Sequence, residues 1–322
     1  MPMICFCIIG GYEMISNFLT VGQQVVVLFI LIGVGFVCKK ATLISDKAIK
    51  SLTNLALYVA TPCVIIVSFQ NCKFTSDKLV NMLVMILSVA IIHIGSIVIC
   101  TLIFRNKDEA KKVVLRVGSI FSNCGFMSLP LQKAILGNDG VFYGAIYVAV
   151  FNIFIWTYGL VAMSGDKKEL SLKKLITNPG IVGVVIAILL WVFHIQLPTI
   201  LYSPIDYLGA LNTPIPMIII GCQLANTSLK SMFTDKYSYL CIGVRLVAIP
   251  LVSLFLLYLF GVRGNMLVAT VIATSAPSAA TTTMFATKYD RDVPLSVSLV
   301  SATTLASIVT MPTIVAISQM FA

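Results

Sequence analysis

Two apolar segments of the chain each carry polar residues around a proline. The first set is Asn123, Gly125, Ser128 and Pro130, and the second set is Thr274, Ser275 and Pro277. Glycine, serine and threonine form helices poorly and proline removes a backbone hydrogen bond, so we expect both segments to break here. A half-helix beginning at about each proline would offer free N–H groups and a partial charge of about +0.5. Two such ends facing one cavity would suit a carboxylate, which makes these residues candidates for substrate binding.

Two further polar residues within apolar segments are candidates for the same site. Arg245 is the one strong base that lies in the interior of such a segment, away from its ends. Either its long side chain reaches the membrane interface, or it binds a carboxylate or acts in gating. Asn152 shares its segment with Tyr147 and Tyr158, and it either bonds a neighbouring helix or contacts the substrate.

Acidic and metal-binding residues are missing from the centres of these segments. The twelve Asp and Glu residues fall in loops or near segment ends. Carriers driven by protons or sodium usually use an intramembrane carboxylate, so we expect no such relay here, although carbonyls and hydroxyls could still hold sodium. The nine cysteines form no CxxC pair and have no histidine at metal-binding spacing. The sequence therefore predicts no metal site and no cofactor, and without HExxH or a nucleophile–base pair it predicts no enzyme.

The elements that position these residues are membrane-spanning helices. Hydrophobic residues make up 59% of the chain and charged residues 11%, against about 25% charged in soluble domains. Apolar runs of about 20 residues, each long enough to span a bilayer, recur along the chain. They lie at roughly 18–38, 48–70, 79–104, 113–136, 140–163, 177–196, 200–225, 237–260, 264–287 and 294–318. We predict an all-α polytopic membrane protein with ten transmembrane helices.

The two halves of the chain resemble each other. Thr61-Pro62 in the second span and Thr213-Pro214 in the seventh are each followed by an aliphatic run. The proline-marked fourth and ninth spans match at a similar offset. Five spans per repeat is an odd number, so the second repeat would be inverted. We predict residues 1–163 as the first repeat, 164–176 as a cytoplasmic linker and 177–322 as the second repeat.

The prolines are expected to act in two ways. Spans four and nine should break into unwound crossover helices at Pro130 and Pro277, where polar neighbours can satisfy the freed backbone groups. Pro62, Pro214 and Pro250 should only kink their helices.

The chain has a net charge of +10, and the positions of its basic residues indicate how it is oriented in the membrane. Seventeen lysines and arginines fall in the odd-numbered connections between spans and four in the even-numbered ones. Positive charge concentrates in cytoplasmic loops, so both termini are expected outside and the protein in the cell membrane. A stripe that binds nucleic acid would not alternate in this way.

The first thirteen residues do not fit a signal peptide, because their apolar run has no basic flank and no small-residue cleavage site. Met14 opens a segment that looks like a natural start. We therefore leave open whether Met14 is the true start or the first thirteen residues are a tail.

The motif of the fourth span resembles a known family. Asn123-x-Gly125-Phe126-Met127-x-x-Pro130-Leu131 is similar to the signature of the auxin efflux carrier family, bacterial permeases related to the plant PIN-formed transporters. These belong with the bile-acid carriers to one superfamily. Ser275-Ala276-Pro277, and Arg245 with Pro250, are similar too, and the resemblance covers the chain after Met14.

The resemblance implies a scaffold part and a transport part, with spans four and nine crossing at their prolines and an elevator-like movement. In the plant relatives an asparagine before each crossover proline helps to bind the carboxylate substrate. Asn123 matches the first, but Thr274 and Ser275 stand at the second, so auxin itself is not the expected substrate. Bacterial relatives are associated with malate, malonate and similar acids. The expected partners are a small organic anion and the lipid bilayer, with a homodimer left open.

Three functions remain open at this point. The first is a permease for a small organic anion such as a mono- or dicarboxylate. The second is a sodium-coupled organic anion symporter of the bile-acid type, which shares the architecture. The third is a membrane sensor that keeps the carrier fold without transport.

Overall fold

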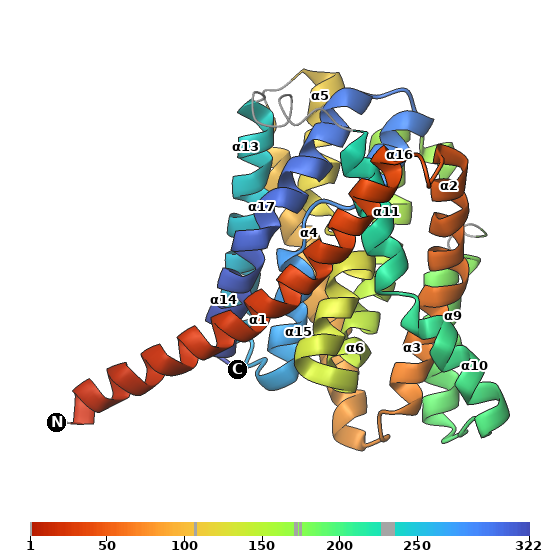
Figure 1. The fold of residues 1–322 in the computed structure, drawn as a ribbon. Helices are drawn as coiled ribbons and strands as arrows, with labels where there is room; N and C mark the ends of the chain where they lie inside the picture. The colour runs from red at the N-terminus through yellow and green to blue at the C-terminus, as the bar shows by residue number, and fades with distance from the viewer. Residues whose placement is uncertain (1, 106–107, 171–172, 174–175, 227–235) are drawn as a thin grey trace.

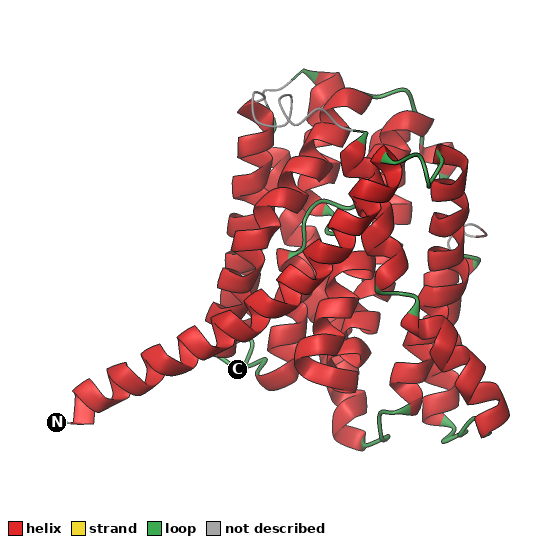
Figure 2. Cartoon of the chain, viewed as in Figure 1, coloured by secondary structure: helices red, strands yellow, loops and turns green. Residues whose placement is uncertain are grey.

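The structure is a computed structural model of the chain. It describes the backbone of residues 2–105, 108–170, 173, 176–226 and 236–322, and the side chains within these ranges except those of 2–18, 20, 109 and 110. Part of the predicted 164–176 linker therefore lies outside the described residues. Within these ranges the chain is helical and holds no strand, only one isolated bridge between two residues (Figure 2). The all-helical prediction is confirmed.

Helices occupy most of the described chain. In order they are α1 (Pro2–Lys40), α2 (Asp46–Leu55), α3 (Thr61–Gln70), α4 (Ser76–Ile103), α5 (Glu109–Ile120), α6 (Leu129–Phe154), α7 (Leu160–Ser164), α9 (Pro179–Val192), α10 (Thr199–Ala210), α11 (Pro214–Ala225), α13 (Lys236–Ile242), α14 (Ile249–Leu259), α15 (Gly264–Ser275), α16 (Thr281–Lys288) and α17 (Val293–Gln319). Wider π-helical turns join α2 to α3, α6 to α7 and α13 to α14, and another precedes α6. Seven helical stretches are long and apolar enough to cross a membrane.

Helix α6 folds back on itself at Gly137. This residue has a φ of +64°, which glycine adopts without strain. The side chains of Leu129 and Gln132 lie directly against Gly144. On a straight helix twelve residues would rise about 18 Å, so the two parts of α6 must run side by side. With this reversal and the two shorter apolar helices α9 and α15, every predicted span contains a helical segment. The crossing of a membrane by all ten, and the inversion of the halves, stay predictions.

The prolines act differently from the prediction at two positions. Pro130 lies inside a continuous helical stretch, directly after the π-helical turn Cys124–Ser128, and the backbone break comes earlier, at Phe121–Asn123. Pro214 begins α11 after a short non-helical stretch, where only a kink was expected. Pro62 and Pro250 each follow a π-helical turn and the helix continues through them. The wider turn relieves the clash that proline makes with the preceding carbonyl, so proline alone does not mark the break.

The helices pack side by side as a bundle (Figure 1), and two clusters of buried apolar residues lie between them. Helix α1 packs against α11 and α17, and α3 packs against α9 and α10. At the contact of α1 with α11, a methyl group on Gly35 would overlap the backbone of Ile218, and one on Gly221 would overlap the backbone of Ile32. Small residues allow this approach where lipid supplies no hydrophobic force between helices.

Candidate substrate site at a helix crossing

Two broken helical segments meet inside the bundle. The first runs from α5 through Phe121–Asn123 into the turn before α6, and the second runs from α15 through Ala276–Ala280 into α16. The Asn123 N–H donates to the Pro277 carbonyl at 2.7 Å, and the Ala279 N–H donates to the Phe121 carbonyl at 2.9 Å. These bonds pair backbone groups that the breaks leave open, which is a requirement inside a membrane protein.

A cavity of about 250 Å³ lies against this crossing. The start of each second half-helix lines it, through Asn123 and Gly125 in one segment and Ala280 and Thr281 in the other. No side chain caps either helix start. The described residues that line the cavity are all uncharged. Its electrostatic character therefore comes from the two helix ends, each with about +0.5 charge.

Two hydroxyl groups in the cavity wall have no partner. Ser122 Oγ and Thr281 Oγ1 are buried, and neither has a hydrogen-bond partner in the described part of the chain. Ser122 is only 1% exposed. A buried polar group without a partner costs about 1–3 kcal/mol of folding free energy. Such a group is therefore a candidate to bind a ligand or an ordered water.

Four asparagines surround the same space: Asn54, Asn123, Asn152 and Asn178. Asn178 is the residue before α9, and its side-chain oxygen accepts from the N–H groups of Gly180 and Ile181. A third helix start thus reaches the cavity, but its first donors are already occupied. Sequence reasoning missed Asn178, although asparagine directly before proline is a recognisable helix-start signal.

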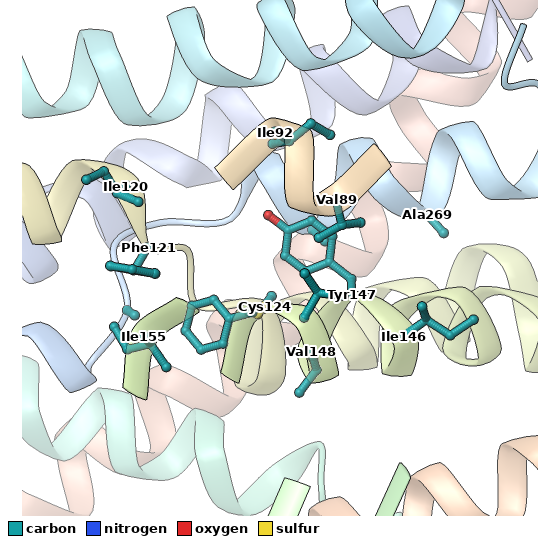
Figure 3. Packing of buried hydrophobic residues seen from close by; sticks show 14 of the residues in the cluster. Val89, Ile92, Ile120, Phe121, Cys124, Ile146, Tyr147, Val148, Ile155 and Ala269 are labelled. Atoms are coloured by element: carbon teal, nitrogen blue, oxygen red, sulfur yellow. The ribbon is translucent and has the colours of Figure 1, made fainter. Parts of the chain in front are cut away.

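Apolar side chains pack beside the crossing. Cys124 and Tyr147 pack with Phe121, Val148 and Ile155 in a buried cluster (Figure 3). This cluster packs against the backbone of the first broken segment.

Residues 20–315 match the family model described as membrane transport protein. The chain belongs to this family. The family holds auxin efflux carriers and PIN-like proteins, so the predicted resemblance is confirmed, as is the assignment to transporters and not enzymes. With its apolar helices this makes the chain a multi-pass membrane protein.

Two archaeal relatives of this membrane transport protein support the assignment. One is an uncharacterized transporter of Methanothermobacter thermautotrophicus, 24% identical over 90% of this chain and 96% of the relative. The other is an uncharacterized transporter of Methanocaldococcus jannaschii, also 24% identical, over 88% of this chain and 94% of the relative. Both alignments extend over nearly the whole chain.

The transporter brings only some of the predicted site residues to the cavity. Asn123, Gly125 and Asn152 line it. Thr274 and Ser275 instead bond carbonyls of their own helix, Val271 and Ile272, at 3.1 Å each.

The remaining predicted residues hold the crossing or lie beyond it. Ser128 Oγ lies 3.4 Å from the Ile272 carbonyl of the other segment. Pro277 contributes its carbonyl to the pairing with Asn123. Pro130 lines a second cavity, described below.

Arg245 is buried at the back of the transporter's crossing and is only 1% exposed. Its guanidinium donates to the carbonyls of Ser119, Ile120 and Thr274. The interpretation that its side chain reaches the membrane interface is wrong, because these buried carbonyls hold it inside the bundle. Arg245 is also not among the residues that line the cavity, so its predicted contact with substrate stays untested.

A second cavity of about 280 Å³ lies between α3, the start of α6 and α10. Pro130, Lys133, Asp206 and Asn212 line it. Asn212 is hydrogen-bonded at 2.8 Å to Thr61, which lines the first cavity. This contact between the second and seventh predicted spans therefore lies between the two cavities. Among the described residues no group of three or more His, Cys, Asp or Glu side chains could hold a metal ion.

Proposed function

We propose that this transporter is a permease that moves a small organic anion, such as a mono- or dicarboxylate, across the cell membrane. The observation that carries the proposal is the wall of the first cavity. Two uncapped helix starts and two residues with buried, unpartnered hydroxyls, Ser122 and Thr281, line one space without charged side chains among the described residues. An anion there would gain both helix ends and satisfy both hydroxyls.

The size of the cavity favours a small substrate. Sites for drug-sized ligands span roughly 300–1,000 Å³, and this cavity holds about 250 Å³. A carboxylic acid of a few carbons fits such a space, whereas a bile acid with its four fused rings does not. Asn123 would donate its amide to the carboxylate, and Asn54, Asn152 and Asn178 would contact the rest of the substrate.

The proposed mechanism is an elevator-type alternating access. Cavities on both sides of the Thr61–Asn212 contact support it, since a moving crossing would expose its site to one and then to the other. In this proposal ten segments cross the membrane as two inverted repeats. Both chain ends would then lie outside, in keeping with their position toward the same end of the bundle in Figure 1.

Counterflow in proteoliposomes tests the proposal. Purified protein is reconstituted with unlabelled malonate, malate or acetate inside, and uptake of the labelled acid is measured. We expect exchange of at least one acid. Asn123→Ala should lower this exchange strongly and still insert into the membrane, because the side chain meets the cavity and takes no part in helix capping.

Asn265→Ala is the matched control for this variant. Asn265 lies at the start of α15, where its amide is 3.5 Å from Asp139 and far along the helix from the crossing. It should transport as the wild type does. Unchanged affinity and rate in Asn123→Ala would remove Asn123 from the site, and failure of all acids to exchange or to raise thermal stability would refute the anion permease.

A further inference from the structure

Arg245 joins the ends of two helices at the crossing. Its Nη1 lies 3.1 Å from the Ser119 carbonyl and 2.9 Å from the Ile120 carbonyl, both in the last turn of α5. Its Nη2 bonds the Thr274 carbonyl, in the last turn of α15. The two helices that enter the crossing therefore end on one guanidinium, on the side away from the cavity.

No acidic side chain in the described part of the chain balances this charge. Within the described ranges the ion pairs are Lys39 with Asp46 and Lys78 with Asp139, and neither involves Arg245. A helix C-terminus carries about −0.5 charge. Two such ends balance about one positive charge, which is the charge of one guanidinium.

The position is one where transporters with broken helices commonly hold a cation. Carbonyls at the ends of half-helices coordinate Na⁺ in such proteins, while the opposite half-helix starts bind the anionic substrate. Here the carbonyl ends and the helix starts are separated in the same way, but a side chain occupies the cation position. A π-helical turn, Gly243–Ala248, carries Arg245 to it. Such turns are rare and concentrate at functional positions.

We propose that Arg245 is the resident cation of the crossing, a positioning residue that holds the ends of α5 and α15 together where an exchangeable monovalent cation would otherwise bind. Removing the guanidinium would leave a latent cation site made of three carbonyls. The link to substrate rests on the proposed function, since the balanced C-termini leave the two helix starts free to attract one carboxylate. The cation role itself does not depend on transport.

Chemical rescue tests the proposal. The melting temperature of purified Arg245→Ala in detergent is measured in choline chloride, and then with sodium or guanidinium added at millimolar concentrations that do not denature proteins. In choline we expect a fall of roughly 5 °C or more relative to wild type, because a buried charge network is lost. Guanidinium, sodium or both should restore most of this loss and leave the wild type unchanged. Arg245→Lys, which keeps a cation, should need no rescue.

Arg116→Ala is the matched control. Arg116 also donates to a backbone carbonyl, that of Thr101 at 3.1 Å, but to one carbonyl only and outside the crossing. Neither cation should change its melting temperature. If Arg245→Ala responds to cations no more than Arg116→Ala does, or if sodium raises the stability of the wild type, the proposal is overturned.

Transport assays separate this proposal from the proposed function. Absence of exchange for every acid tested would refute the permease and leave the rescue result standing. Where exchange is found, Arg245→Ala should lose it in choline and recover it with the cation that restores stability. Should Arg245→Ala not be recovered from membranes, Arg245→Lys and the sodium response of the wild type decide the question. A Lys variant with wild-type stability in choline supports the resident cation, and a wild type that requires sodium overturns it.

Discussion

Thr281→Val distinguishes a ligand-binding hydroxyl from a structural one. If the hydroxyl stabilises the fold, the unliganded variant should melt at a lower temperature than the wild type, and if it only binds ligand, the melting temperature should not fall. Thr281 Oγ1 is buried at the start of α16 and has no hydrogen-bond partner among the described residues. Valine keeps the shape and removes the hydroxyl. An unsatisfied buried polar group costs about 1–3 kcal/mol, so the unliganded variant should melt at the same temperature as the wild type or higher.

The affinity of Thr281→Val for a carboxylate should be lower than that of the wild type. A hydrogen bond to a charged group contributes about 1.5–3 kcal/mol, which corresponds to about a 10- to 150-fold loss of affinity for a carboxylate. The assay is the melting temperature of purified protein titrated with the acid that wild type exchanges, since ligand binding raises stability by mass action.

Thr287→Val is the control within the same helix. Its hydroxyl is exposed and bonds the Thr283 carbonyl at 2.9 Å, so affinity should not change. A lower melting temperature of unliganded Thr281→Val with unchanged affinity would show that this hydroxyl serves the fold, and the cavity would lose one of its anion contacts.

Two substitutions test the helix contacts around the cavity, one in α6 and one between the second and seventh predicted spans. Gly144→Ala should destabilise the protein by about 1–3 kcal/mol, because the added methyl would overlap Gln132, which is fully buried and donates to a carbonyl of α15. Thermal unfolding measures this loss. Gly95→Ala is the control, since a methyl there meets nothing within 4 Å. Thr61→Val removes the hydroxyl that bonds Asn212 between the two cavities, so we expect the exchange rate to change more than the affinity; equal rates in counterflow would exclude a role of this bond in movement.

The sequence predicted the helices well, because hydropathy reports the membrane environment directly. Polar residues inside apolar segments are rare, which is why Asn123, Gly125 and Asn152 could be proposed from the sequence. These three residues line one cavity, and their contact with substrate stays a prediction. The break near Pro130 was placed too late along the chain. Proline restricts only the turn before it, and the π-helical turn Cys124–Ser128 absorbs that restriction. The break lies instead where Phe121 and Asn123 find backbone partners on the other segment, and local sequence does not show such partners.

The burial of Arg245 at the crossing could not be predicted from the sequence for the same reason. An arginine eight or nine residues into a span can reach the interface or stay inside, and the choice depends on what the interior offers. Here it offers the carbonyl ends of α5 and α15, which come together only because their segments cross. Burial of this charge is therefore a property of the crossing and not of the helix that carries it.

The three helix starts at the cavity are not equivalent, and the difference locates the anion. The start of α9 has proline as its first residue and Asn178 as its cap, so its next two N–H groups are bonded internally. The starts after Asn123 and Ala280 have no side-chain cap. An anion gains most where donors lack partners, so the carboxylate should bind at the crossing and turn its remaining atoms toward Asn178. In the proposed elevator mechanism, a negatively charged group bound at the crossing would move with it, whereas one held at α9 would stay with the helices that pack against α3. Only the first arrangement would let the substrate travel with the part proposed to move, which is what alternating access by an elevator requires.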